Sequence, residues 1–67
     1  MNTLADELPR QQARCRDILE NALSIGAPGA LLVAILRVSL ANAEKAAAAG
    51  DIGAMVAACA DLQGYKE

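Results

Sequence analysis

The chain has 67 residues, which is enough for one domain at most. Its formal net charge of −2 and its pI near 4.9 argue against an electrostatic nucleic-acid binder. The absence of histidine from the sequence excludes His-based catalysis and His metal sites. The hydrophobic content of 55% overstates the core, because sixteen residues are alanine and both phenylalanine and tryptophan are absent.

The sequence predicts neither a leader nor a membrane span. Its first residues, MNTLADELPRQQ, are acidic and polar where a signal peptide is basic and then apolar. The uncharged span 21–36 is interrupted by Gly26, Pro28 and Gly29, and it is shorter than the about 20 apolar residues of a spanning helix. We therefore expect a cytoplasmic protein with reduced cysteines, and we predict no membrane partner, small-molecule ligand, metal or cofactor.

A first helix is predicted at 6–24, because apolar residues recur there at helical spacing within one arc of about 140°. Asp6 is the preferred N-cap, since it leaves Pro9 in the first turn, where no intrahelical N–H bond is lost. With the alternative cap, Thr3, Pro9 would lie inside the helix as a kink. The arc contains Leu4, Leu8, Cys15, Ile18, Leu19, Ala22 and Leu23.

A second helix is predicted at 28–49, after a joint in which Gly26 takes the left-handed conformation and Pro28 occupies the first turn. Its first half holds one charge, Arg37, and its large apolar residues cover about 220° of the helical wheel. An ordinary surface helix has an apolar stripe of little more than about 100°. This half must therefore be covered on more than one side, and we expect the first helix to pack across it. One of two rows should remain as the candidate interface, either Leu32, Leu36 and Leu40 or Leu31, Ile35 and Val38.

The dipeptide Gly50-Asp51 predicts a sharp turn into a third helix at 51–62, since Gly suits the position after a helix and Asp caps the next one. The second and third helices should then form an antiparallel hairpin. We expect Gly64 to end the third helix and Tyr65, the sole aromatic residue, to pack against the end of the bundle. The inward face is predicted to hold Ile52, Met55, Val56, Cys59 and Leu62.

Cys15 and Cys59 both lie on the apolar faces of their predicted helices. This placement favours two small buried hydrophobic residues. A disulfide or redox pair stays open, because it requires Cα atoms within about 7 Å of each other. Metal ligation by these two thiols across a dimer is a further alternative.

Three motifs span most of the chain: L-A-x-E-L-P at the start, G-D-x-x-A-M at the second joint, and L-x-G near the end. In these motifs the chain resembles a set of short proteins, without established function, encoded in proteobacterial genomes and their prophages. The resemblance implies a bacterial or phage origin, and it implies no catalytic or binding residue. The matching positions are Leu4, Ala5, Glu7, Leu8 and Pro9, then Gly50, Asp51, Ala54 and Met55, then Leu62 and Gly64.

These features together predict an all-α, single three-helix domain over 1–67. Because chains this short are marginally stable alone, we expect a non-enzymatic interaction module that forms a homodimer or docks on a protein partner through the second helix. The alternative is a small nucleic-acid-associated regulator that uses Arg10, Arg14 and Arg16, which the acidic pI and the scarcity of stacking aromatic residues oppose. A membrane-surface helix is a third class, opposed by the scarcity of Lys and Arg beside the apolar block.

Overall fold

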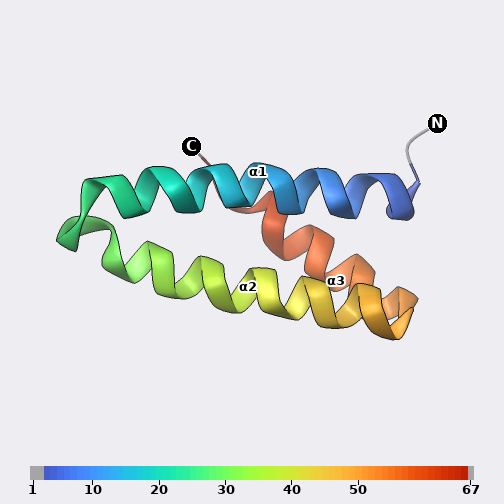
Figure 1. Cartoon of the computed structure of the whole chain (residues 1–67). Helices are drawn as coiled ribbons and strands as arrows, with labels where there is room; N and C mark the ends of the chain where they lie inside the picture. The colour runs from blue at the N-terminus through green and yellow to red at the C-terminus, as the bar shows by residue number, and fades with distance from the viewer. Residues whose placement is uncertain (1–2, 67) are drawn as a thin grey trace.

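The computed structural model describes residues 3–66, and three α-helices account for most of them (Figure 1). No strand occurs within this range, so the predicted all-α three-helix domain is confirmed. The element boundaries differ from the predicted ones by at most two residues at each end. The helices are α1 (Leu4–Ile25), α2 (Ala30–Ala49) and α3 (Ile52–Gln63), and a short 3-10 helix η1 (Ala27–Gly29) leads into α2.

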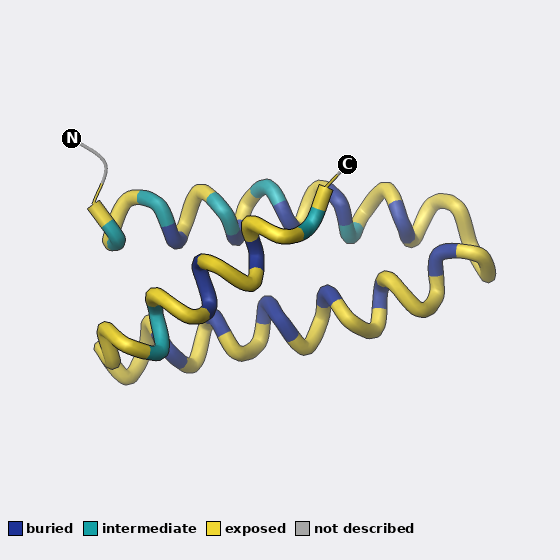
Figure 2. The backbone as a smooth tube through the Cα atoms, turned by 180° about the vertical axis from the view of Figure 1, so that it is seen from behind, coloured by how far each residue is buried: buried dark blue, intermediate teal, exposed yellow. Residues whose placement is uncertain are grey.

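The three helices differ in length, and this difference shapes the molecule. α1 has 22 residues and α2 has 20, so at about 1.5 Å per residue they run side by side for about 30 Å. α3 has 12 residues, so it is only about 18 Å long. It returns from the far end of α2 toward the middle of α1. In both backbone views the part of the α1–α2 pair near the first turn has no third helix beside it (Figures 1 and 2).

The predicted cap at the start of α1 is wrong, and the alternative cap is correct. Thr3 is the N-cap, and its hydroxyl accepts a hydrogen bond from the Asp6 N–H at 3.3 Å and donates one to the Asp6 carboxylate at 3.0 Å. The Thr3 carbonyl also accepts from the Glu7 N–H at 2.8 Å. These bonds satisfy first-turn groups, so the helix begins at Leu4 and Pro9 lies in its interior.

The joint between α1 and α2 is tighter than predicted. Gly26 has φ 83° and ψ −137°, so φ is positive but the conformation is not the predicted left-handed helical one. Pro28 belongs to η1, and α2 therefore begins two residues later than expected. A Cβ atom at Gly29 would overlap the carbonyl oxygen of Ala22, so only glycine allows η1 to pack this closely against α1.

The hairpin between α2 and α3 is confirmed in detail. Gly50 is left-handed, with φ 64° and ψ 24°, and its N–H donates to the carbonyls of Ala46 and Ala47. The Asp51 carboxylate accepts a hydrogen bond from the Ala54 N–H at 3.2 Å. Glycine therefore ends one helix and aspartate starts the next, as the dipeptide predicts.

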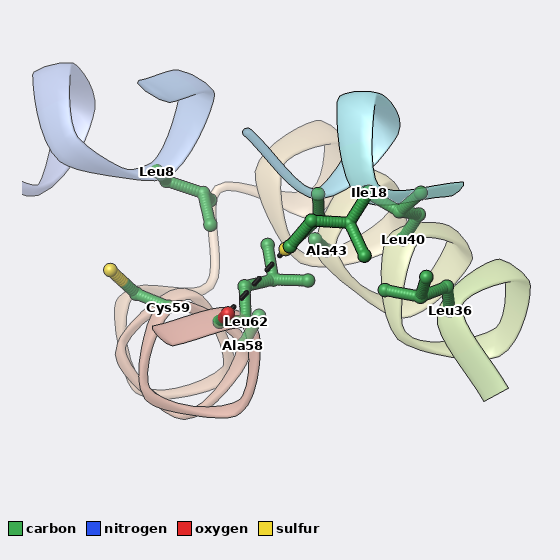
Figure 3. Close-up of a cluster of buried hydrophobic side chains, with 9 residues drawn as sticks. Leu8, Ile18, Leu36, Leu40, Ala43, Ala58, Cys59 and Leu62 are labelled. Carbon is green, nitrogen blue, oxygen red and sulfur yellow. Dashed lines mark hydrogen bonds between the residues drawn. The ribbon is translucent and has the colours of Figure 1, made fainter. Parts of the chain in front are cut away.

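All three helices contribute to one small core, shown in Figure 3. The inward face of α3 was predicted incorrectly, because Ile52 and Val56 are exposed and Ala58 is buried in their place. Leu23 of α1 is also exposed, against expectation. The buried cluster consists of Leu8, Cys15, Ile18, Leu36, Leu40, Ala43, Ala58, Cys59 and Leu62.

Two polar contacts fix the end of α3 at mid-length of the α1–α2 pair. The Arg14 guanidinium donates to the carbonyls of Leu62 and Tyr65, at 2.7 and 2.6 Å. The hydroxyls of Tyr65 and Ser39 share a hydrogen bond of 2.8 Å. Tyr65 therefore packs against the middle of α2 and not, as predicted, against the end of the bundle.

Candidate functional site

The candidate interface on α2 divides between two faces of the helix. Leu36 and Leu40 lie in the core of the chain itself, with 0% and 7% of their surface exposed. Because they already contact α1 and α3, the structure removes both from the candidate interface. The remaining candidates are exposed, and they are Leu31, Leu32, Ile35 and Val38.

These four side chains form one continuous surface, which we name the outer stripe. Their exposed fractions are 74% for Leu31, 36% for Leu32, 45% for Ile35 and 62% for Val38. At about 100° per residue they cover an arc of about 120° with Ile35 near its centre. That arc is as wide as the apolar stripe that an ordinary helix buries, so α2 carries enough apolar surface for a second helix contact.

Between residues 30 and 41 the outer stripe has few polar neighbours along α2, and the polar residues Asn42 and Lys45 follow on the same side. In the stretch 30–41 the other exposed residues are Ala30, Ala34, Ala41 and Arg37, of which only Arg37 is charged. Arg37 points to a groove between α1 and α2 on another side of the helix. Charged residues gather in that groove, which is lined by Arg37, Arg16, Glu20 and Glu44, and Arg16 pairs with Glu44 at 3.3 Å.

The exposed apolar side chains cluster in one part of the molecule. We name this part, residues 19–38, the open half, because α3 and its tail end at the level of Ser39. Of the eight large apolar side chains described as exposed, six lie in the open half and two on α3. The six are Leu23, Ile25, Leu31, Leu32, Ile35 and Val38.

The arginines of α1 do not form a shared face. Arg10 pairs with Glu7 of its own helix at 3.0 Å, and Arg16 pairs with Glu44 of α2. Arg14 is bound to the two carbonyls at the end of α3. Each guanidinium therefore has a separate partner within the chain, and the arrangement gives no support to a common phosphate-binding surface.

Cys15 and Cys59 are free thiols and both are buried, as predicted for small hydrophobic residues. The Cys15 thiol donates to the Leu62 carbonyl at 3.4 Å, and the Cys59 sulfur accepts from the Gln63 amide at 3.8 Å. Burial raises the pKa of the Cys15 thiol above its usual value; the Asp61 carboxylate adds to this rise and the Arg14 guanidinium opposes it. At neutral pH Cys15 is therefore the protonated thiol, which is a poor nucleophile.

The other surface features offer little chemistry. An open groove of about 470 Å³ runs between α2 and α3, and most of its lining residues are alanines. The Asp51 carboxylate in this groove is occupied by its cap hydrogen bond. Within residues 3–66 no three potential metal-ligating side chains lie together. The outer stripe is therefore the most distinctive surface in the described part of the chain.

Comparison with protein-family models, with curated proteins and with solved structures gives no match for this chain. By length and composition alone, the helical stretch Ala27–Ala49 is long and apolar enough to cross a membrane. The same stretch buries one side in the core, as the central helix of a folded domain does. The argument for function therefore rests on the exposed side of α2.

Proposed function

We propose that this chain is a non-enzymatic interaction module that uses the outer stripe of α2 to dimerise or to dock on a protein partner. The observation that carries the proposal is the exposure of Leu31, Ile35 and Val38 on the side of α2 that faces away from Arg37. Contiguous exposed apolar surface of this kind marks protein contact sites in soluble proteins. We place the protein in the cytoplasm of a bacterial host, where Cys15 and Cys59 stay reduced.

The size of the stripe limits how it works. Fully burying a leucine or valine side chain gains about 1.5–3 kcal/mol, whereas association costs roughly 4–15 kcal/mol in lost freedom. Four half-exposed side chains do not exceed that cost by a wide margin. The partner must therefore also cover neighbouring surface of the open half, such as Ile25 and the alanines beside the stripe.

Photo-crosslinking in living bacterial cells tests this function. A photoreactive residue replaces Val38 in the stripe, and in a matched control it replaces Val56 on α3, since these valines are 62% and 54% exposed. We expect position 38, and not position 56, to form one discrete protein adduct. Equal adducts from both positions, or none from position 38, would contradict the proposal.

A further inference from the structure

We infer that the partner of the outer stripe is a second copy of this chain, and that the open halves of two copies form a four-helix bundle. The inference rests on the proposed function, because it names the partner of the surface assigned there. Three observations support it: α3 does not extend along the open half, the charges lie away from the stripe, and the side chains of the stripe are spaced for an antiparallel pair.

The open half has an unfilled position beside α1 and α2 where α3 would lie if it were longer. Ile25 is 11 residues after Arg14, which at about 100° per residue puts it within about 20° of the side of α1 that reaches α3. Leu32 is 7 residues before Ser39, which likewise puts it within about 20° of the side of α2 that contacts Tyr65. Both exposed side chains therefore face the line along which α3 would continue.

The charge distribution favours an identical partner. A twofold axis places each residue near its own copy, so a charge at the centre of the contact would repel itself. The span 21–36 holds no charged residue. Arg37 and Arg16 line the groove with Glu20 and Glu44 on another side of α2, and Lys45, which shares the side of Val38, lies seven residues beyond it and outside the open half. Two open halves can therefore meet without burying a charge.

The spacing within the stripe fits an antiparallel pair. Leu31 is four residues before Ile35, and Val38 is three residues after it. With the twofold axis at Ile35, the two Ile35 side chains meet, and Leu31 of one copy lies within one residue, about 1.5 Å along the helix, of the level of Val38 of the second copy. Ala34 beside the stripe has little bulk, so the helices can approach closely. Each α2 then fills the position beside the other pair that α3 leaves empty, which gives the four-helix arrangement.

The area that a stable dimer requires is a modest fraction of the chain's accessible surface. A specific interface buries about 800 Å² from each partner, which is about one fifth of the 4273 Å² of accessible surface that this chain exposes. Of the six exposed large apolar side chains in the open half, Leu23 lines the charged groove, and the other five lie outside that groove. Their burial enlarges a core whose central cluster, among the described residues, holds five side chains larger than cysteine, namely Leu8, Ile18, Leu36, Leu40 and Leu62.

Two matched substitutions test the identity of the partner. We expect light scattering to give the purified chain a dimer mass, and we expect Val38→Asp to weaken dimerisation at least about a hundredfold, because symmetry buries two charges in one interface. Val56→Asp on α3 should leave the dimer intact. Circular dichroism monitors folding, and the exposure of both valines lets both variants keep their helices. A wild-type monomer at high micromolar concentration, or equal dimerisation of both variants, would overturn the inference.

Cysteine crosslinking tests the arrangement. Under mild oxidation Ile35→Cys should form a covalent dimer by itself, whereas Leu31→Cys and Val38→Cys should crosslink mainly when mixed with each other. The wild-type chain, whose own cysteines are buried, is the control. Self-crosslinking of Leu31→Cys and of Val38→Cys, without a mixed product, would mean a parallel pair and would overturn the antiparallel bundle.

The results separate this inference from the proposed function. If the purified chain is a monomer while position 38 crosslinks to a different protein in cells, the second copy is wrong and the interaction module stands. If position 38 gives no protein adduct, both are wrong. Flotation with phosphatidylcholine–phosphatidylglycerol vesicles, lost in Val38→Asp, would assign the stripe to a lipid surface and would also overturn the inference.

Discussion

Arg14 is the residue that ties the third helix to the first. Its guanidinium donates to the carbonyl of Leu62 in the last turn of α3 and to the carbonyl of Tyr65 just beyond the helix. The Arg14 residue is partly buried between these helices. Neither contact follows from the sequence pattern, which places Arg14 on the charged side of its helix.

Removing this side chain should weaken the attachment of α3. We expect Arg14→Leu to lower the free energy of unfolding by about 1.5–3 kcal/mol, the usual range for hydrogen bonds to a charged group. Arg10→Leu is the matched control, since Arg10 makes one exposed ion pair, and it should cost at most about 1 kcal/mol. Urea denaturation measures both variants, and equal losses would show that Arg14 does not anchor α3.

The Cys15 thiol should make stability fall in alkaline solution. Burial raises its pKa above the ordinary 9.0, so the native state holds the proton more tightly than the unfolded chain does. The stabilisation from Cys15 is then complete below the unfolded pKa and is lost as the pH rises through the native pKa. Relative to a Cys15→Ala variant, the stability of the wild type should be constant from pH 7 to about 8 and should decrease above about 9. Parallel pH profiles for the two proteins would refute this assignment.

Asp51 is the clearest single cap in the chain. Asp51→Ala removes the acceptor for the Ala54 N–H, and we expect a loss of about 0.5–2 kcal/mol in the free energy of unfolding. Asp51→Asn keeps an acceptor oxygen at the same place and should lose much less. Thermal melts of the two variants check this, and an unchanged transition for Asp51→Ala would contradict the cap.

Among the elements, α1 carries a proline that works against it. Pro9 is six residues after the Thr3 cap, at a position where the N–H of any other residue would donate to the Ala5 carbonyl four residues earlier. Because proline has no N–H, that hydrogen bond is absent. Pro9→Ala should restore that bond and stabilise the protein by about 1–2 kcal/mol, somewhat less than the full proline cost because alanine loosens the unfolded chain. The melting temperature measures the gain. A loss of stability would mean that Pro9 is needed for the shape of α1.

The element boundaries were largely predictable because their signals are local. Gly50 and Asp51 carry the helix end and the helix start in their own backbone and side-chain chemistry, and the structure reproduces both. The start of α1 was predicted incorrectly because the sequence offers two caps, Thr3 and Asp6. Sequence rules favoured Asp6 as the cap because Pro9 then lies in the first turn. The hydrogen bonds of Thr3 with Asp6 and Glu7 instead start the helix at Leu4, which leaves Pro9 in its interior.

It was harder to predict which side of each helix is buried, because this depends on how closely the helices approach each other. The positions of the larger apolar residues predicted that Ile52 and Val56 of α3 are buried. In the structure both are exposed, and Ala58 is buried. Ala43 and Ala46 of α2 are also buried, so small side chains line the contact between the two helices. A reading of hydrophobic periodicity gives most weight to large apolar residues, and it therefore does not identify a helix contact formed by alanines.

The candidate interface was likewise predictable in part. The excess apolar width of α2 predicted that one row of side chains would stay outside the core. The sequence left open which row it was, and the packing against α1 and α3 assigns Leu36 and Leu40 to the core. Ile25 was not predicted as part of the exposed surface, because its place beside the unfilled third-helix position depends on where α3 ends.

At the scale of the whole molecule, the chain combines a closed half with an open one. The closed half has three helices around the core, whereas the open half has two helices and most of the exposed large apolar side chains (Figures 1 and 2). Chains of this length rarely hold more than about 3–5 kcal/mol of stability in one core. Pairing of two open halves would raise this stability by coupling folding to association.

Sedimentation equilibrium of the wild-type chain over a wide concentration range, with melting curves of the same samples, tests the central claim most directly. The account predicts a mass that rises from 6.9 kDa toward twice that value, together with a melting temperature that increases with concentration. A constant mass of 6.9 kDa at high micromolar concentration, with a melting temperature unchanged on dilution, would contradict self-association through the outer stripe.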